Sequence, residues 1–438
     1  MHGHRVGSIV LLTILIFVSR GWGGDAAAPR SEAPRQAPGQ AQPAANATNA
    51  FAIDLYHQLR AEDGNLLVSP YSIATALAMT GGGAAGQTQQ QIETVLHWQV
   101  KLNARPDGPP RVSPPPAVSH RLVNHPDMAA LMQQLNRAGG DKAFDLNIAN
   151  GLWLQRGYAI KAPFKKLVTE TYSGKLAQLD FAQSQQAAGT INDAIARQTR
   201  GKIEDLIPPS ALTADTRLVL TNAVYMKGRW VHPFSERATS DAPWGGAGPE
   251  RPQVPLMRQT ERFFYGQNNQ AQWVQMDYTN APVAMLVVLP RPDVGLAKLE
   301  QTLSADLLEA WVKAMNGRKV ELYLPRFEFT DPTALNKPLA ALGIEDAFEP
   351  GRSDFSSITD AEDLYIQSAL HKAFIAVDEE GTEAAAATAI AVGATSVDTS
   401  RPVVFRADRP FLFFIRDTRS GVLLFMGRMI QPAAADAG

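Results

Sequence analysis

The stretch VDEEGTEAAAATAIAVGATS, from Val377 to Ser396, is the most informative part of this chain. Alanine has the highest intrinsic helix propensity, so a run of this composition favours a helix. However, Gly381 opens the run, β-branched residues interrupt it, and Gly393 followed by Ser, Thr and Asp residues ends it. No face of the run carries the broad apolar stripe of a packed helix. We therefore expect the stretch to take another structure, which the rest of the sequence helps to identify.

The segments on either side of this stretch favour β-strands. LYIQSALHKAFIAVD leads into it, and RPFLFFIRD and GVLLFMGRMI follow it. Further strand candidates are FDLNIANGLWL, TRLVLTNAVYMKG, APVAMLVVLP and RKVELYLPRFEF. Some of these segments alternate with a period of two and others are apolar throughout, which predicts large sheets that are partly buried on both faces.

Helical patterns lie mostly before the strands and do not alternate with them regularly, which indicates an α+β protein. The candidates are GQTQQQIETVLHW, PDMAALMQQLNRA, APFKKLVTETYS, QAAGTINDAIARQTR, SADLLEAWVKAMN and DPTALNKPLAALG. In the last of these, Asp331 is placed as a cap before Pro332, and Gly343 stands just past the expected end.

Composition narrows the class of protein. Hydrophobic residues make up 45% of the 438 residues, which is enough for a sizeable core. The net charge of −2 offers no basic surface, so we expect no nucleic-acid partner. The chain has no cysteine, which excludes disulfides, thiolate metal sites, a cysteine nucleophile and lipid attachment at a leader cysteine. Stability must therefore come from a large core.

The N-terminal residues have the order of a secretory signal: a basic start, the 13-residue apolar run VGSIVLLTILIFV and a small-residue exit. We predict a signal peptide at 1–24 rather than a membrane anchor, because a spanning helix needs roughly 20 apolar residues. The mature protein would then be secreted and extracellular, or periplasmic if bacterial, without membrane attachment.

Composition divides the remainder of the chain. Residues 25–49 are rich in Pro, Ala and Gln, which favours a flexible tether, and contain a glycosylation sequon at Asn46. Residues 50–432 have a globular composition, interrupted by a proline-rich stretch at 105–120 that we expect to be a surface insert. We expect residues 433–438 to form a disordered tail.

The sequence lacks the usual motifs of a nucleophile elbow, a zinc protease or a phosphate loop. Its eight histidines have no metal-ligand spacing, so we predict no metal and no cofactor. One polar constellation stands within apolar segments: Ser69, Ser72, Asn222 and His371. A Ser–His pair oriented by a third group is the arrangement of an activated nucleophile. A hydrogen-bonded network at the start of a buried helix explains these residues better, and we do not predict an enzyme.

Four long segments, in order along the chain, resemble the serpin family, the large serine-protease inhibitors that trap their targets irreversibly. NLLVSPYSIATALAMTGGGAAGQT is similar to the segment that begins the family's helix B, and LTNAVYMKGRWVHPF to a central strand ending at a buried tryptophan, here Trp230. HKAFIAVDEEGTEAAAAT is similar to the strand and hinge before the reactive loop, and RPFLFFIRDTRSGVLLFMGRMIQP to the C-terminal strands. The resemblance runs from Phe51 to Pro432.

The resemblance implies a single-domain fold with about three β-sheets, eight to nine helices and an exposed reactive-centre loop, with hinge and loop together at 379–402. It also implies that the four polar residues of this constellation belong to a region of the main sheet that moves, and not to an active site. Trp230 matches the breach, where insertion of the loop into the main sheet begins. The shutter, beneath the point where that sheet opens, is matched by Ser69, Pro70, Ser72, Asn222 and His371.

Loop insertion, which the family performs after cleavage, requires every second side chain of the loop to enter the core. Counting in twos from the start of the hinge, the inward set is Thr382, Ala384, Ala386, Thr388, Ile390 and Val392. The outward set is Glu383, Ala385, Ala387, Ala389 and Ala391. The inward residues are all small or β-branched and the only charge falls outward, whereas a shift of one residue would bury an unpaired carboxylate.

The hinge itself is assigned by the resemblance to Glu380–Thr388. We expect Gly381 to supply a permissive backbone at the bend. Glu379 and Glu380 lie before the bend and need not be buried.

The resemblance places the scissile residue about fourteen positions after the hinge glycine, so that Thr395–Ser396 is the reactive bond. Ala394–Thr395 is the neighbouring alternative. Both bonds offer a small, uncharged bait that fits an elastase-like or subtilisin-like pocket, whereas a trypsin-like pocket needs Arg or Lys. Arg401, the nearest base, precedes a proline and lies far from the hinge.

The function implied is therefore irreversible, suicide-substrate inhibition of a serine protease by a monomer that forms a covalent acyl complex with its target. Two other functions stay open. The first is a non-inhibitory serpin acting as a carrier or chaperone, against which the intact hinge pattern argues. The second is a secreted hydrolase that uses Ser72 and His371.

Overall fold

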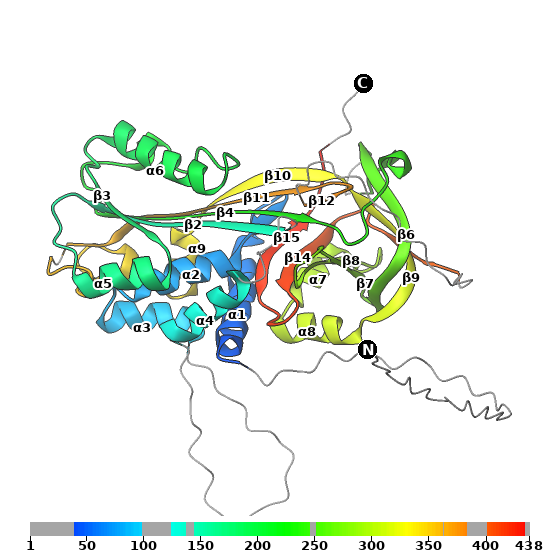
Figure 1. The fold of residues 1–438 in the computed structure, drawn as a ribbon, viewed down its shortest axis with the longest axis horizontal. Coiled ribbons are helices and arrows are strands. Elements are labelled where there is room, and N and C mark those ends of the chain that lie inside the picture. Colours follow the sequence, from blue (N-terminus) through cyan, green and yellow to red (C-terminus); the bar gives the residue numbers. More distant parts are fainter. Residues whose placement is uncertain are drawn as a thin grey trace, which may run out of the picture. The chain divides into compact units, whose positions relative to one another are not determined.

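The structure, a computed structural model, describes residues 39–98, 124–136, 144–245, 251–361, 363–382 and 401–433. All of these except Gly39 belong to one compact unit, Gln40–Gly438. Among the described residues of this unit, helices and two β-sheets pack around a large common core (Figure 1). None of the helices in the described ranges is long and apolar enough to span a membrane.

Nine α-helices are present among the described residues, and every residue of α2 is buried. Their bounds are α1 (Ala41–Leu59), α2 (Pro70–Gly81), α3 (Gly86–Val95), α4 (His125–Asn136), α5 (Ala162–Lys166), α6 (Ser184–Gln198), α7 (Leu296–Gln301), α8 (Ala305–Ala314) and α9 (Asn336–Leu342). The start of α2 follows from its sequence, because Ser69 caps it by accepting from the Ser72 backbone N–H and Pro70 occupies the first turn.

The first sheet has six strands in the order β10–β11–β12–β4–β2–β3. Their bounds are β10 (Phe327–Ala334), β11 (Ile366–Val377), β12 (Gly381–Thr382), β4 (Leu218–Arg229), β2 (Phe144–Gln155) and β3 (Lys175–Leu179). At one end β12 lies between β11 and β4, but over most of their length β11 and β4 pair directly with each other, in parallel. We call this direct pairing, of 366–374 with 218–225, the seam.

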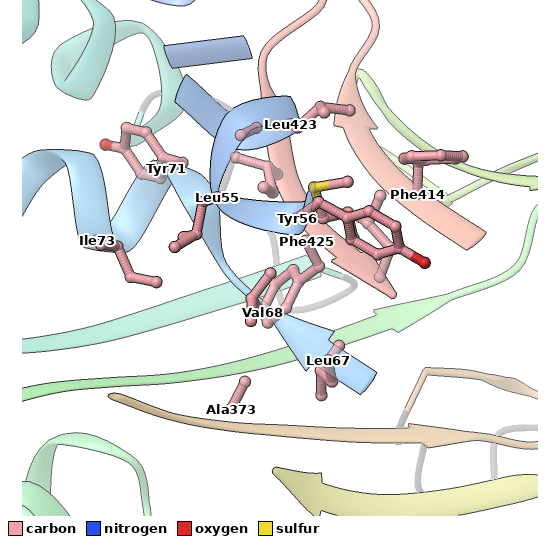
Figure 2. Packing of buried hydrophobic residues seen from close by; sticks show 14 of the residues in the cluster. Leu55, Tyr56, Leu67, Val68, Tyr71, Ile73, Ala373, Phe414, Leu423 and Phe425 are labelled. Atoms are coloured by element: carbon pink, nitrogen blue, oxygen red, sulfur yellow. The ribbon is translucent and has the colours of Figure 1, made fainter. Parts of the chain in front are cut away.

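Side chains of this sheet alternate between two apolar layers, as the strand period of two requires. On β4, Leu220 and Val224 enter the main core, whereas Val219 and Ala223 enter a second cluster beneath α6. Helix α6 covers one face of the sheet, and α1 and α2 lie on the other (Figure 1). In Figure 2, side chains of α1, α2, β14 and β15 gather above Ala373 of β11. The seam is therefore buried on both faces.

The second sheet has nine strands, in the order β1–β15–β14–β8–β7–β6–β9–β13, with β5 paired to β6. Their bounds are β1 (Leu66–Val68), β5 (Ser240–Pro243), β6 (Gln253–Gln267), β7 (Ala271–Asp277), β8 (Val283–Pro290), β9 (Asn316–Pro325), β13 (Val403–Arg406), β14 (Phe411–Asp417) and β15 (Leu423–Met429). The long β6 pairs with β7 at one end and with β9 along most of its length. It thereby joins two of the three expected sheets into one.

The predicted α+β class is confirmed, and each predicted strand segment contains a strand. Two predictions at element boundaries are wrong. The flexible tether does not extend to residue 49, because α1 begins at Ala41 and buries Ala44, Ala45 and Ala47. Alanine-rich composition resembles a linker, but small side chains also allow close helix packing. Asp331 is not a helix cap, because it lies in the edge strand β10, where proline is tolerated, and α9 begins at Asn336.

Candidate functional site: the hinge and the seam

The two residues of β12 are held between β4 and β11 at the hinge end of the seam. Gly381 pairs with Arg229, and Thr382 pairs with Gly228 of β4 and with Val377 of β11, both antiparallel. A strand added between β4 and β11 would therefore begin here, with its register already fixed.

Gly381 is required at this position by close backbone approach. A Cβ at Gly381 would lie 2.0 Å from the carbonyl oxygen of Gly228, a contact with backbone that no rotamer change can relieve. The sequence predicted a glycine for a permissive bend, but Gly381 is not among the glycines with positive φ. Its function in the described structure is to let β12 pack against β4.

Thr382 points into the core, on the face that the predicted alternation requires. Its side chain is buried, and its Oγ1 lies 2.6 Å from the hydroxyl of Tyr278. Tyr278 in turn stacks on Trp230, with ring centroids 4.5 Å apart. Burial raises the pKa of Tyr278, so its hydroxyl stays protonated. The start of the added strand is thus bound by an aromatic pair.

Trp230, the predicted breach residue, also holds the backbone that leads into β12. Its backbone N–H donates to the carbonyl of Glu380 at 2.9 Å, and its indole Nε1 donates to the carbonyl of Asp378 at 3.1 Å. The N–H of Phe234 donates to the carbonyl of Glu379 at 2.7 Å. Three consecutive hinge carbonyls are therefore satisfied from one segment.

Glu379 is buried, which corrects the expectation that it need not be. Only 4% of the residue is exposed, and its carboxylate accepts from Arg326 at 2.5 and 3.1 Å and from the Thr239 hydroxyl at 2.6 Å. Burial opposes ionisation, but these hydrogen bonds outweigh it and hold the pKa of Glu379 below its usual value. The ion pair fixes the hinge to the junction of β9 and β10.

The predicted shutter residues meet at the seam. Asn222 of β4 lies opposite His371 of β11 and opposite Asn150 of β2. Its amide nitrogen donates to the Ser72 hydroxyl at 2.5 Å and to Asn150, and its oxygen accepts from His371 Nδ1. These hydrogen bonds connect α2, β2, β4 and β11.

His371 is a neutral member of this network. Its Nε2 accepts from the backbone N–H of Ser69 at 3.2 Å, so that both ring nitrogens are in use. Complete burial lowers the pKa of His371 to about 3. The Ser69 hydroxyl donates to the carbonyl of Leu424, and the Ser72 hydroxyl is bonded to Asn222. Neither serine hydroxyl is hydrogen-bonded to His371, so the geometry does not form an activated nucleophile.

The remaining predicted residues are placed as follows. Pro70 is buried in the first turn of α2, and Glu380 leads directly into β12. Within the described ranges, no group of three His, Asp or Glu side chains could hold a metal ion. Several predictions lie outside the described residues: the hinge positions Glu383, Ala384, Ala385, Ala386, Ala387 and Thr388, and the reactive-bond positions Ala394, Thr395 and Ser396.

Comparison with known proteins agrees with this geometry. The family model described as serpin (serine protease inhibitor) matches residues 46–432. The chain belongs to the serpin family. An uncharacterised serpin-like protein of Thermococcus kodakarensis is 37% identical to this serpin over 400 residues, which cover 90% of this chain and 87% of the relative.

Two further relatives extend the comparison. The leukocyte elastase inhibitor of Sus scrofa is 35% identical over 398 residues, covering 88% of this serpin and 98% of that protein. The crystal structure of human thyroxine-binding globulin complexed with thyroxine superposes with a TM-score of 0.78 and 26% identity, covering 90% of this serpin and all of that chain. The single-domain serpin fold is thus shown.

Sequence reasoning missed four residues of the site: Asn150, Thr239, Tyr278 and Arg326. Each lies on a strand or loop far along the chain from the group it contacts. Arg326 is the exception that a signal could have revealed, because LPRFEF places one cation in an apolar strand segment, where a charge usually has a partner.

Proposed function

We propose that this serpin is an irreversible suicide-substrate inhibitor of serine proteases. The observation that carries the proposal is the position of β12: Gly381 and Thr382 already lie between β4 and β11, while the rest of these strands are paired with each other along the seam. Residues that follow β12 in the chain would extend it by separating the seam.

The register of β12 supports this extension. Each residue further along the chain would face one residue earlier on β4 and one earlier on β11. Glu383 would then lie opposite Lys227 on the outer face, where opposite charges attract across strands. Thr388 would face Asn222 and His371, which places the polar inward residue at the polar shutter.

The apolar inward residues would find apolar neighbours in the same register. Ala386 would face Val224 and Ala373, and Ile390 would face Leu220, all of which belong to the main core. Alternation of side-chain size and polarity in the loop therefore matches the two strands that would receive it.

The energy of insertion is sufficient for trapping. Insertion exchanges one strand interface for two, a net gain of about ten backbone hydrogen bonds. At about 0.5–1.5 kcal/mol each, this stabilises the inserted form by roughly 10 kcal/mol. Antiparallel pairing also replaces the slightly less stable parallel seam.

Cleavage would start the exchange. The serine oxygen of the protease attacks the carbonyl carbon of Thr395, the bond to Ser396 breaks, and the new amino group takes up the proton. The ester between protease and loop remains. When the loop enters the sheet it carries the protease with it, and misplacement of the reacting groups by about 1 Å slows hydrolysis ~100-fold.

The bait residues favour proteases with small or tolerant specificity pockets, of elastase-like or subtilisin-like type. The similarity to a protein named leukocyte elastase inhibitor supports this choice. We also propose that the chain is secreted by its N-terminal signal and acts as a monomer. A carrier function is the second candidate, because the fold is similar to that of thyroxine-binding globulin.

A gel assay tests the proposal. The protein is incubated with an elastase-like and a subtilisin-like protease, and we expect a complex that survives SDS. Thr382→Arg would place a charge in the core position beside Tyr278 and should convert the inhibitor into a substrate. Thr190→Arg, on the exposed side of α6, is the matched control and should still trap. Absence of a complex with either protease would favour the carrier.

A further inference from the structure

A polar cluster joins β4 and β11 at the end of the seam opposite to β12. Arg217 immediately precedes β4, and Asp363 lies three residues before β11. Arg217 Nε donates to Asp363 Oδ2 at 3.1 Å, and the Tyr158 hydroxyl donates to Asp363 Oδ1 at 2.8 Å. We call Tyr158, Arg217 and Asp363 the foot clasp.

Both donors of the foot clasp are fixed to the sheet. Arg217 Nη1 also donates to the carbonyl of Ala214 at 3.0 Å, and the Arg217 carbonyl accepts from the N–H of Gln155 at 2.8 Å. The carbonyl of Tyr158 accepts from the Gln178 side chain at 2.6 Å. The hydrogen bond from Tyr158, with that from Arg217, lowers the pKa of Asp363, so its carboxylate stays ionised.

The foot clasp stabilises the fold only weakly. The Asp363 side chain is 61% exposed and that of Arg217 is 27% exposed, and ion pairs in such positions contribute little to folding stability. The clasp therefore bears on loop insertion through its position, and not through its contribution to folding stability.

The register of β12 leads the inserted strand to this position. Eleven residues after Thr382 comes Gly393, which would lie opposite Arg217, eleven residues before Gly228. Glycine is the one residue without a side chain to meet the arginine there.

On the other side, fourteen residues after Thr382 comes Ser396, opposite Asp363, fourteen residues before Val377. The bulge between Ile366 and Ser368 moves this correspondence by at most about one residue. The loop residues 393–396, which end at the proposed reactive bond, would thus pass between Arg217 and Asp363.

Full insertion must separate the two sides of the clasp. The N-terminal ends of β4 and β11 are neighbours in this structure. A strand inserted between them would roughly double the spacing of their backbones, from about 4.8 Å to about 10 Å. The direct contact between Arg217 and Asp363 would be lost.

The surface beside the clasp has room for the end of an inserted strand. A hollow of about 500 Å³ opens beside the N-terminal ends of β4 and β11. It is lined by Asp215, Arg217, Pro350, Gly351, Asp363 and Tyr365.

We propose that the foot clasp determines whether insertion is completed before the acyl bond is hydrolysed. The clasp must open for the last loop residues to enter between β4 and β11, so its opening sets the partition of each encounter between trapping and escape. The inference rests on the proposed function, because it concerns the final part of the same insertion.

The direct test holds the clasp closed. The chain has no cysteine, so Arg217→Cys/Asp363→Cys introduces two unique thiols, which a short bis-maleimide can join. The same double variant with each thiol capped by N-ethylmaleimide is the control. We expect the capped protein to form the SDS-stable complex, and the joined protein to be cleaved at the loop while the protease is released active.

The possible results separate the two proposals. If the joined and capped proteins trap the protease to the same extent, the clasp proposal is overturned and the inhibitory function stands. If the wild-type chain forms no complex, both proposals are overturned.

A second variant weakens the clasp. Asp363→Asn removes its charge and should speed completion of insertion about two- to five-fold, the effect of an exposed ion pair, and lower the number of inhibitor molecules consumed per protease. Glu309→Gln, which breaks the exposed ion pair with Lys313 on α8, is the control. Equal rates in the two variants would contradict the proposal.

Discussion

Two regions along β4 and β11, the hinge end and the seam, have different strand pairings. At the hinge end, β12 lies between the strands and pairs with both, antiparallel; along the seam the same two strands pair directly with each other, in parallel. The difference shows that β4 and β11 accept either arrangement without a change in the alternation of their side chains. The hinge end thus already has the arrangement, a strand paired antiparallel with both β4 and β11, that the proposed insertion would extend along the seam.

The supporting contacts of the two ends also differ. The hinge end is held by the ion pair of the buried Glu379 with the half-exposed Arg326, by an aromatic stack and by hydrogen bonds from Trp230. The seam is closed by the neutral hydrogen-bonded network of Asn222 and His371. The ion pair and the Trp230 hydrogen bonds thus support β12, while a network centred on Asn222 closes the seam that the proposed insertion would open.

The largest effect is expected from Gly381→Ala. The new Cβ would meet the Gly228 carbonyl, and overpacking of this kind costs about 1–3 kcal/mol, which should expel β12 from between its neighbours. We expect the number of inhibitor molecules consumed per trapped protease to rise about ten-fold. Gly189→Ala is the control, because a Cβ there meets nothing within 4 Å. Trapping unchanged in Gly381→Ala would remove β12 as the starting point.

The hinge ion pair gives the next effect. Arg326→Met leaves the buried Glu379 carboxylate without its main partner, which should lower the free energy of unfolding by about 2 kcal/mol or more, measured in urea. Arg258→Met breaks the more exposed pair with Glu321 and should cost less than about 1 kcal/mol. Equal losses would mean that the hinge end is not specially anchored.

The seam should respond to pH through His371. Because burial lowers the pKa of His371 to about 3, the unfolded chain binds a proton below about pH 6.5 that the folded chain does not. Stability from this group is present above that pH and is lost as the pH falls toward 3, about 2 kcal/mol between pH 7 and 5. His371→Gln should remove this slope from urea unfolding curves, whereas His232→Gln, at an exposed position, should keep it.

The smallest effect is expected from Tyr278→Phe. The substitution removes one buried hydrogen bond, to Thr382, worth about 0.5–1.5 kcal/mol. Amide exchange of Thr382 should become faster by a factor of about ten or less. Tyr323→Phe, which loses a hydroxyl contact with Glu321 on the second sheet, should leave that exchange unchanged.

The local sequence pattern predicted the strands of the seam well. Both β4 and β11 are long, mostly apolar segments in which the shutter residues Asn222 and His371 stand among apolar residues. The inward direction of Thr382 followed from alternation, once the family resemblance implied that this segment enters a sheet. Burial of Glu379 could not be predicted, since its partner Arg326 is 53 residues away and only the fold brings them together. The start of α1 was missed because alanines signal a linker and a packed helix equally well. Residues of the reactive bond lie outside the described residues and stay predictions.

The most direct measurement compares the thermal unfolding of the intact protein with that of the protein cleaved in its loop by a metalloprotease, which forms no acyl-enzyme. An added strand worth roughly 10 kcal/mol should raise the midpoint by about 10 °C or more in a domain of this size. Equal midpoints before and after cleavage would show that no strand enters the seam and would contradict the account.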